Sequence, residues 1–144
     1  LAGKSPLEEA IVDSLADQYA DYRVEIKPWW RTVIGESEGD VVSLKRHDYL
    51  SFLLEQLKID VVLPARDKFL GFITKFLKEN KSGFLVGDSV TWVDVLISEH
   101  CATMVESFIP EFLDGYPEVK NHIEKVRAIP NLKKWIETRP KTKF

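Results

Sequence analysis

The sequence predicts an all-α domain, a bundle of five to seven helices around one buried central helix. Three observations lead to this prediction. Apolar residues recur at spacings of three and four, no run alternates between apolar and polar residues as a half-buried strand would, and residues 92–109 are apolar on nearly every face. A chain of 144 residues is long enough for one domain with a substantial core.

The start of the predicted buried helix carries the sharpest local signal in the chain. Thr91 is expected to be the N-cap, accepting a hydrogen bond from the backbone N–H of Asp94, while the Asp94 carboxylate accepts one from the N–H of Thr91. Val90 and Val95 stand where a hydrophobic staple would lie, and Gly87 supplies the preceding turn. We therefore assign Thr91 and Asp94 a structural capping role.

The first helix is expected to begin at Ser5 and to run to about Trp30. Ser5 would cap it, Pro6 would take the first helical position and Glu8 would close a capping box. Pro28 is expected to bend or thin the last turns. The inward face is predicted from apolar residues at spacings of three and four: Leu7, Ile11, Leu15, Tyr19, Tyr22 and Ile26.

Three aspartates lie on the other side of this helix. Asp13, Asp17 and Asp21 are four residues apart, so at about 100° per residue they form one row. Like charges at this spacing destabilise a helix by a few tenths of a kcal/mol per pair. The row is either a solvated face, which composition alone favours, or an acidic surface that meets a cation at an interface or at the edge of a cleft.

The remaining elements follow from breakers and apolar spacing. Residues 34–42 form a polar loop, and a helical pattern resumes near Ser43. Residues 59–78 predict a long helix in which Pro64 either causes a kink or starts a new helix. Residues 84–86 are expected to be an extended linker rather than a strand. Pro117 and Pro130 open two further helices, the second ending at residues 139–140.

Composition argues against several classes of function. The formal net charge of −3 does not suit nucleic acid as the main partner, and no apolar run reaches the roughly 18 residues of a membrane span. Cys101 has no partner for an internal disulfide, and His47 has no second His or Cys at ligand spacing, so no metal site is expected. His100 and Cys101 are predicted to pack in or beside the core. Pattern and composition alone name no function.

Together, the capping stretch, the acidic row and the tail resemble the C-terminal domain of cytosolic glutathione transferases. Residues 87–94 look like that domain's capping box and staple, and residues 1–4 resemble the linker after the family's first domain. Asp13, Asp17, Asp21 and Arg23 resemble its first long helix. Residues 139–144 are similar to the tail of the sigma-like class, which includes nematode transferases and haematopoietic prostaglandin D synthase. The resemblance covers essentially the whole chain.

This resemblance implies an N-terminal thioredoxin-like domain, which the present chain lacks. In the family, that domain binds the co-substrate glutathione and carries the Tyr that stabilises its thiolate for attack on apolar electrophiles. No catalytic residue is therefore expected within this chain. The complete protein is expected to be a cytoplasmic homodimer that uses glutathione and no metal.

The resemblance also implies binding residues on the helical domain. Asp21 matches the family carboxylate that reaches the γ-glutamyl ammonium of glutathione in the neighbouring subunit, and Asp17 matches an interface carboxylate on the same row. Asp13 receives no role, because it lies nearer the helix start. The electrophile pocket is expected to take side chains from five positions: Arg23, Trp29, Leu96, Ile97 and Phe144.

Two other classes of function stay open. Helical domains of this family make protein contacts in translation elongation factor subunits and aminoacyl-tRNA synthetases, and lens crystallins derived from sigma transferases are structural proteins. The intact row of aspartates favours a catalytic parent, because neither alternative needs a contact to glutathione. The sequence that precedes Leu1 in the complete protein would discriminate between these classes.

Overall fold

The computed structural model describes residues 1–35 and 43–140, with backbone only for residues 43–47. Within these ranges it contains helices and no strand, which confirms the all-α prediction. In chain order the elements are α1 (Pro6–Glu25), α2 (Lys27–Val33), α3 (Ser43–Leu57), the π-helical turn η1 (Lys58–Val62), α4 (Leu63–Glu79), α5 (Trp92–Ser107), α6 (Pro117–Arg127) and α7 (Pro130–Thr138).

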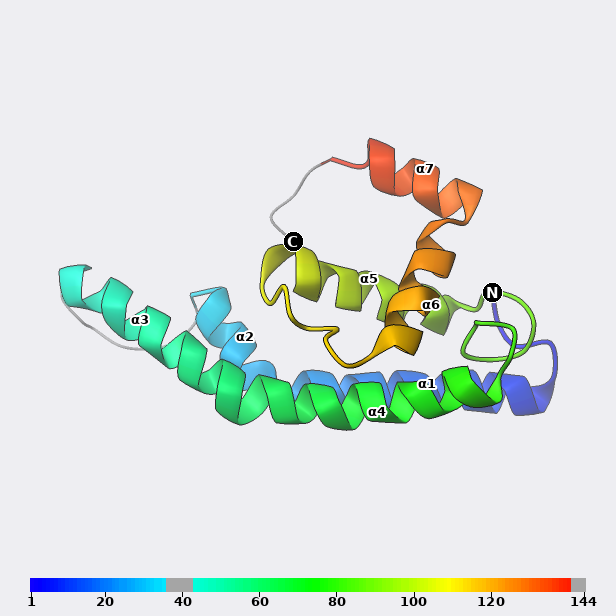
Figure 1. The fold of residues 1–144 in the computed structure, drawn as a ribbon, viewed down its shortest axis with the longest axis horizontal. Helices are drawn as coiled ribbons and strands as arrows, with labels where there is room; N and C mark the ends of the chain where they lie inside the picture. The colour runs from blue at the N-terminus through cyan, green and yellow to red at the C-terminus, as the bar shows by residue number, and fades with distance from the viewer. Residues whose placement is uncertain (36–42, 141–144) are drawn as a thin grey trace.

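The long helices α1 and α4 lie side by side along one edge of the molecule (Figure 1). Helix α5 packs on α1 and α6, while α6 also packs on α4, so α5 lies at the centre of the arrangement. Helix α7 contacts α6 and has no buried residue. Helices α1, α4, α5 and α6 therefore enclose a core, whereas α7 is attached at the surface.

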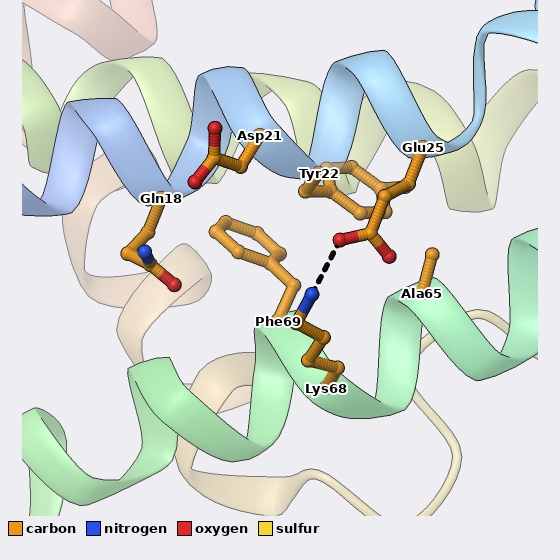
Figure 2. Close-up of a pocket in the computed structure, with 7 residues that line it drawn as sticks. All are labelled: Gln18, Asp21, Tyr22, Glu25, Ala65, Lys68 and Phe69. Atoms are coloured by element: carbon orange, nitrogen blue, oxygen red, sulfur yellow. Dashed lines mark hydrogen bonds and ion pairs between the residues drawn. The ribbon is translucent and has the colours of Figure 1, made fainter.

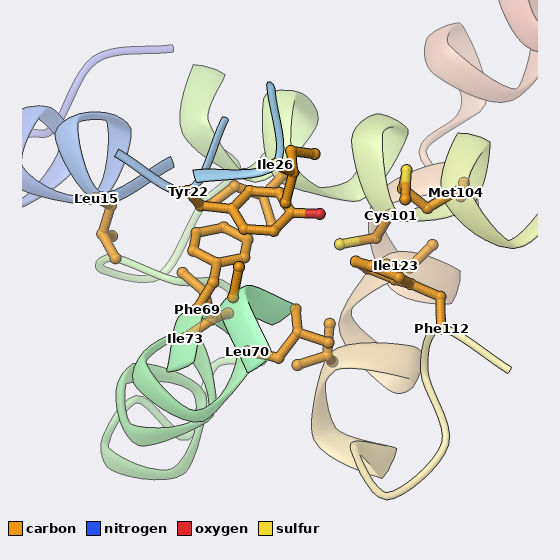
Figure 3. Packing of buried hydrophobic residues seen from close by; sticks show 14 of the residues in the cluster. Leu15, Tyr22, Ile26, Phe69, Leu70, Ile73, Cys101, Met104, Phe112 and Ile123 are labelled. Carbon is orange, nitrogen blue, oxygen red and sulfur yellow. The ribbon is translucent and has the colours of Figure 1, made fainter. Parts of the chain in front are cut away.

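The core fills the space between α1, α4, α5 and α6 (Figure 3). The Tyr22 and Phe69 rings stack with centroids 4.8 Å apart, which joins α1 to α4. Cys101 and Met104 approach the same core from α5 and are fully buried. Other members of the cluster labelled in the figure are Leu15, Ile26, Leu70, Ile73, Phe112 and Ile123. The prediction that the apolar stretch after Thr91 forms the buried helix is confirmed.

The first helix ends earlier than predicted. Helix α1 stops at Glu25 rather than near Trp30, and Ile26 separates it from α2. Pro28 occupies one of the first two positions of α2, because in a continuous helix its ring would collide with the preceding turn. Leu7 was expected to face inward but is 72% exposed. Residue spacing fixes the side on which Leu7 points, but not whether another element covers that turn.

The capping box predicted at Ser5 differs from the structure in one hydrogen bond. The Ser5 hydroxyl accepts the N–H of Glu8 as predicted, at 3.2 Å. The Glu8 carboxylate, however, accepts the N–H of Lys4 at 2.6 Å, one residue before the N-cap. The start of α1 is therefore held by two side-chain bonds, but the second one fixes the incoming linker rather than the cap residue.

Pro64 is accommodated by a widened turn, so the helical path continues from α3 through η1 into α4 and bends between the two long helices (Figure 1). The N–H of Leu63 donates to the carbonyl of Lys58, five residues earlier, instead of four. A wider turn moves the preceding carbonyls away from the proline ring, which has no N–H to offer them. The sequence left a kink or a new helix open; in the structure α4 begins at Leu63 with Pro64 in one of its first two positions, and a π-helical turn joins it to α3.

The capping box at Thr91 and Asp94 is present. One Asp94 oxygen, Oδ2, accepts the backbone N–H of Thr91 at 2.7 Å and the Thr91 hydroxyl at 2.6 Å. The other oxygen, Oδ1, accepts the N–H of Leu85 at 2.8 Å. Asp94 is fully buried, so it links the start of α5 to the extended segment that precedes it.

Candidate functional site

A cleft of about 330 Å³ opens between α1, α2, α5 and α7. Its wall is mainly aromatic and aliphatic, with a few charged groups. The lining side chains are Tyr19, Arg23, Trp30, Val95, Leu96, Glu99, His100, Thr103, Met104, Trp135 and Arg139. A concave, mostly apolar surface with a few polar groups is the usual form of a small-molecule site.

Helical spacing explains how separate residues reach the same cleft. Tyr19 and Arg23 are four residues apart on α1, and Trp135 and Arg139 are four apart at the end of α7. Val95 and Leu96 are apolar yet only half-buried, although they belong to the central helix. The exposed side of α5 therefore forms the floor of the cleft, while its other sides face the core.

One acidic group in the cleft forms ion pairs with two arginines. Glu99 Oε1 lies 3.1 Å from Arg127 Nε, and Glu99 Oε2 lies 3.3 Å from Arg139 Nη1. The Arg139 guanidinium also stacks on the Trp135 ring at 4.7 Å from its centroid. This network attaches α7, which has no buried residue of its own, to α5 and α6.

A second arginine lies on the opposite wall. The Arg23 guanidinium is 5.0 Å from the centroid of the Trp30 ring, and Arg23 Nη1 lies 3.5 Å from the Tyr19 hydroxyl. Among the described residues, no carboxylate lies within 4.0 Å of Arg23. The Tyr19 hydroxyl has a raised pKa because the side chain is partly buried, so it stays a neutral hydrogen-bonding group.

The histidine and the cysteine of the central helix do not provide reactive groups. Burial, assisted by the nearby Arg23 charge, lowers the pKa of His100 to about 3, so its imidazole is neutral near pH 7. His100 Nε2 lies 3.3 Å from the Tyr22 hydroxyl. Burial raises the pKa of the Cys101 thiol to about 12, which keeps the nucleophilic thiolate form scarce. Their predicted packing in or beside the core is confirmed.

The structure brings together only some of the residues predicted for the electrophile pocket. Arg23 and Leu96 line the cleft, whereas Trp29 and Ile97 do not, since their side chains are 4% and 0% exposed in the core. Their chain neighbours Trp30 and Leu96 take the cleft positions instead. Phe144 lies outside the described residues.

Several lining residues were not predicted. Tyr19 and Thr103 could have been found from the sequence, because they lie four residues before Arg23 and seven after Leu96 on the same helical faces. Trp135 and Arg139 could not, since their position depends on how α7 turns back over α5. The full aromatic lining is therefore a product of tertiary structure.

The row of aspartates lies on the exposed surface of α1. Asp13, Asp17 and Asp21 are all exposed, and none of them forms an ion pair within 4.0 Å among the described residues. Asp21 borders a small groove between α1 and α4 that also holds Gln18 (Figure 2). Across this groove Lys68 donates to Glu25 at 2.5 Å, and the nearby Asp21 charge also helps to raise the pKa of Lys68.

The described residues offer neither a metal site nor a membrane-spanning helix. They contain no group of three or more His, Cys, Asp or Glu side chains placed to hold a metal ion. None of their helices has the length and apolar character that a membrane crossing requires. A second hollow of about 380 Å³ lies between α2, α3 and the end of α5, where Trp29 is part of its lining, but Arg23 and Leu96 line only the cleft described above.

Comparison with known proteins places these features in a family context. Residues 46–139 match the family described as "Glutathione S-transferase, C-terminal domain". A curated relative from Caenorhabditis elegans, "Probable glutathione S-transferase 5", is 47% identical over 144 residues, which is 100% of this chain and 62% of the relative. The chain thus spans about three fifths of the length of such relatives.

Solved structures show the same relationship. A hookworm glutathione S-transferase from Necator americanus, described as monomeric, is 52% identical with a TM-score of 0.86 over 99% of this chain and 63% of its own. A Nu-class transferase from Haemonchus contortus is 48% identical, with a TM-score of 0.77, over 99% and 62%. A prostaglandin synthase D from Nilaparvata lugens is more distant, at 25% identity and a TM-score of 0.73 over 99% and 62%.

Proposed function

The chain belongs to the glutathione S-transferase family as a C-terminal domain, and from this premise we propose that the complete protein is a glutathione transferase. In this proposal, residues 1–144 are joined to a thioredoxin-like domain that binds glutathione and activates its thiol. The helical domain described here supplies most of the pocket for the electrophile. It also supplies a carboxylate that contacts glutathione held by a neighbouring subunit.

The observation that carries this proposal is the open aromatic cleft on the outer side of the buried helix. Val95 and Leu96 are apolar residues of the central helix that remain half-exposed, and Trp135 is 53% exposed beside them. Leaving such residues uncovered costs free energy unless a ligand or another domain meets them. A cleft of this kind suits an apolar electrophile, and its open side suits the domain that would bring the thiolate.

The reaction needs little chemistry from this chain. The glutathione sulfur forms a bond to the electrophilic carbon, and the leaving group departs with the electron pair of the bond that breaks. Side chains of the cleft hold the apolar substrate close to the sulfur and exclude water, which favours the correct geometry for attack. Leu96, Trp30 and Tyr19 are the residues that we assign to this positioning role.

The acidic row provides the proposed contact with glutathione. Asp17 and Asp21 are exposed carboxylates that no described basic residue pairs with, so either could meet an ammonium group brought by another subunit. Asp21 matches the family carboxylate that makes this contact, and Asp17 matches an interface carboxylate on the same row. We assign the contact to Asp21, with Asp17 supporting it from the same row, and both can be tested by substitution.

A cross-subunit contact requires a homodimer, which we therefore include in the proposal. The homodimer places the α1 face of one subunit near the glutathione of the other. One relative, from Necator americanus, is described as monomeric. The oligomeric state of the complete protein should therefore be measured by sedimentation, and a monomer at working concentrations would remove the cross-subunit role of Asp21.

Class and location are the remaining parts of the proposal. The tail and the acidic row support a sigma-like class, whereas identities of 48% to a Nu-class transferase and 25% to a prostaglandin synthase favour the nematode branch. We place the protein in that branch and in the cytoplasm. The use of glutathione as co-substrate without a metal follows from the family.

Conjugation of glutathione to 1-chloro-2,4-dinitrobenzene by the complete protein tests the proposed function. We expect saturable formation of the thioether and release of chloride, and no catalysis by residues 1–144 alone. A complete protein that binds immobilised glutathione but conjugates no electrophile would contradict a transferase. Failure to bind glutathione at all would favour the alternative, a protein-interaction or structural module comparable to those of elongation factors or crystallins.

A further inference from the structure

The cleft carries a surplus of positive charge that an apolar electrophile alone does not use. Its charged lining consists of Arg23, Glu99 and Arg139, and the buried His100 is neutral. Glu99 forms ion pairs with Arg139 through one oxygen and with Arg127 through the other, so its negative charge is already compensated within the protein. Arg23 on the opposite wall has no such compensation among the described residues.

The position of Arg23 leaves its hydrogen-bond donors available. One face of its guanidinium lies over the Trp30 ring, and one terminal nitrogen makes a long contact of 3.5 Å with the Tyr19 hydroxyl. A guanidinium has five N–H donors in a planar fork, and stacking on a ring leaves the donors at its edge free. Trp30 thus fixes the orientation of the fork while the edge stays open to the cleft.

This arrangement selects for a ligand with two parts. The aromatic and aliphatic wall formed by Trp30, Leu96 and Trp135 favours an apolar or aromatic body. The Arg23 fork matches the geometry of a carboxylate or a similar oxyanion, and the apolar surroundings strengthen such a bond relative to bulk water. A neutral apolar ligand would instead leave the guanidinium partly desolvated without a partner, which is unfavourable.

We propose that the cleft prefers electrophiles with an anionic group beside an aromatic or apolar body, and that Arg23 is the residue that binds the anion. The proposal rests on the proposed transferase function, which it refines by naming a substrate class. Arg23 acts in it as a specificity-determining residue, while the sulfur of glutathione forms the new bond. The second arginine, Arg139, belongs to the ion-pair network that holds α7.

Two matched compounds test this proposal with the complete protein. 4-Chloro-3-nitrobenzoate and 4-chloro-3-nitrobenzamide share the reacting carbon, the leaving chloride and the activating nitro group, but only the benzoate is an anion. In both, the glutathione sulfur bonds to the carbon that carries chlorine, and chloride leaves with the electron pair. The measured quantity is the benzoate-to-amide ratio of kcat/KM, which cancels general losses of activity.

We expect the ratio to fall roughly tenfold to a hundredfold in Arg23→Gln, as for the loss of one charge-assisted hydrogen bond. Arg23→Lys keeps the charge but not the fork, so it should lose less. Lys27→Gln is the matched control, because it removes an exposed positive charge on α2 that does not line the cleft. An unchanged ratio in Arg23→Gln, or an equal fall in Lys27→Gln, would overturn the proposal.

Equilibrium binding of the same two compounds, measured by calorimetry without turnover, separates this proposal from the transferase function. If neither compound is conjugated by the wild type, the proposed function fails, yet the binding ratio still reports on Arg23. Weaker binding of the benzoate, but not of the amide, in Arg23→Gln would then support the anion site. Equal binding of benzoate and amide by the wild type would reject it.

Discussion

His100 is a titratable residue that lines the cleft as a buried, neutral ring. Its ring meets Tyr19 and Tyr22 edge-on, with centroids 5.1 and 5.4 Å away, and it is 8% exposed. Because burial holds its pKa at about 3, the folded state disfavours the protonated imidazole. The unfolded chain, with an ordinary His pKa near 6.5, binds the proton more readily. Acid should therefore favour unfolding through this residue.

The predicted pH effect can be measured by urea unfolding. When folding lowers the pKa of a His, the neutral side chain imposes no penalty on the folded state above the pKa of the unfolded chain. The free energy of unfolding then decreases as the pH falls from that pKa towards the pKa in the folded state. Between about pH 7.5 and pH 5, His100 should remove on the order of 2 kcal/mol from the free energy of unfolding. His100→Phe should lose that much less over the same interval.

His122 also contributes to the pH dependence of stability, and its contribution cancels when the two proteins are compared. Its pKa is also lowered, chiefly by burial, so it contributes a loss of the same sign in both proteins. The difference between wild type and His100→Phe isolates His100. An identical loss of stability in the two proteins would mean that His100 is not buried as the structure shows.

At the scale of single residues, Arg23 and Leu96 lie in the cleft as predicted, Trp29 and Ile97 lie in the core instead, and the residues that α7 contributes were not predicted. Trp29 and Trp30 are adjacent, and about 100° of rotation between them decides which one is buried. The break at Ile26 sets that rotation for α2, and the sequence pattern did not place it. The same rotation separates Ile97, in the core, from Leu96, in the cleft.

The start of α5 is held by several hydrogen bonds to one buried carboxylate. Asp94 accepts three hydrogen bonds, from the N–H groups of Thr91 and Leu85 and from the Thr91 hydroxyl. It also lies 3.6 Å from His122 Nε2, whose ring contacts the Gly83 carbonyl through Nδ1 at 3.1 Å. One carboxylate therefore links the helix start, the segment before it and α6.

Removing this carboxylate should destabilise the fold more than removing an ordinary N-cap side chain does. Thr91→Ala is expected to cost about 0.5–2 kcal/mol of unfolding free energy, as for other N-caps. Asp94→Ala leaves two buried N–H groups without acceptors and should cost about 2–4 kcal/mol. Chemical denaturation followed by circular dichroism measures both. Asp88→Ala, an exposed carboxylate in the preceding turn, should have the smallest effect.

The three variants should therefore lose stability in a fixed order, with Asp94→Ala the least stable and Asp88→Ala the most stable. If Asp94→Ala were no less stable than Asp88→Ala, the buried carboxylate would not be the link that the geometry indicates. The ligand affinity of the complete protein should change little in Thr91→Ala, since Thr91 does not line the cleft.

At the scale of elements, sequence signals worked where the determinant was local. The starts at Pro117 and Pro130 and the cap at Thr91 depend on neighbouring residues, and the structure confirms them. A proline inside a helical stretch can be accommodated by a kink, by a new helix or by a widened turn. The sequence therefore did not predict the end of α1 at Glu25 or the π-helical turn before Pro64, which also depend on how the helices pack. Tertiary contacts choose among those solutions.

The whole molecule separates its two proposed binding functions. The cleft lies between α1, α2, α5 and α7, whereas Asp17 and Asp21 are exposed on α1, and Asp21 borders the groove towards α4. Opposite sides of one long helix can thus serve a substrate of one active site and glutathione of another. The row of aspartates is visible in the sequence, but the partner that we propose for it, glutathione held by a neighbouring subunit, is not.

This arrangement makes the central claim testable by one equilibrium measurement. The dissociation constant of glutathione should be determined by calorimetry for the complete wild-type protein and for Asp21→Ala and Asp17→Ala, with Asp13→Ala as the control from the same row. We expect weakening of roughly tenfold or more in Asp21→Ala, as for a lost charge-assisted hydrogen bond, and little change in Asp13→Ala. Equal affinity in all four proteins would contradict it.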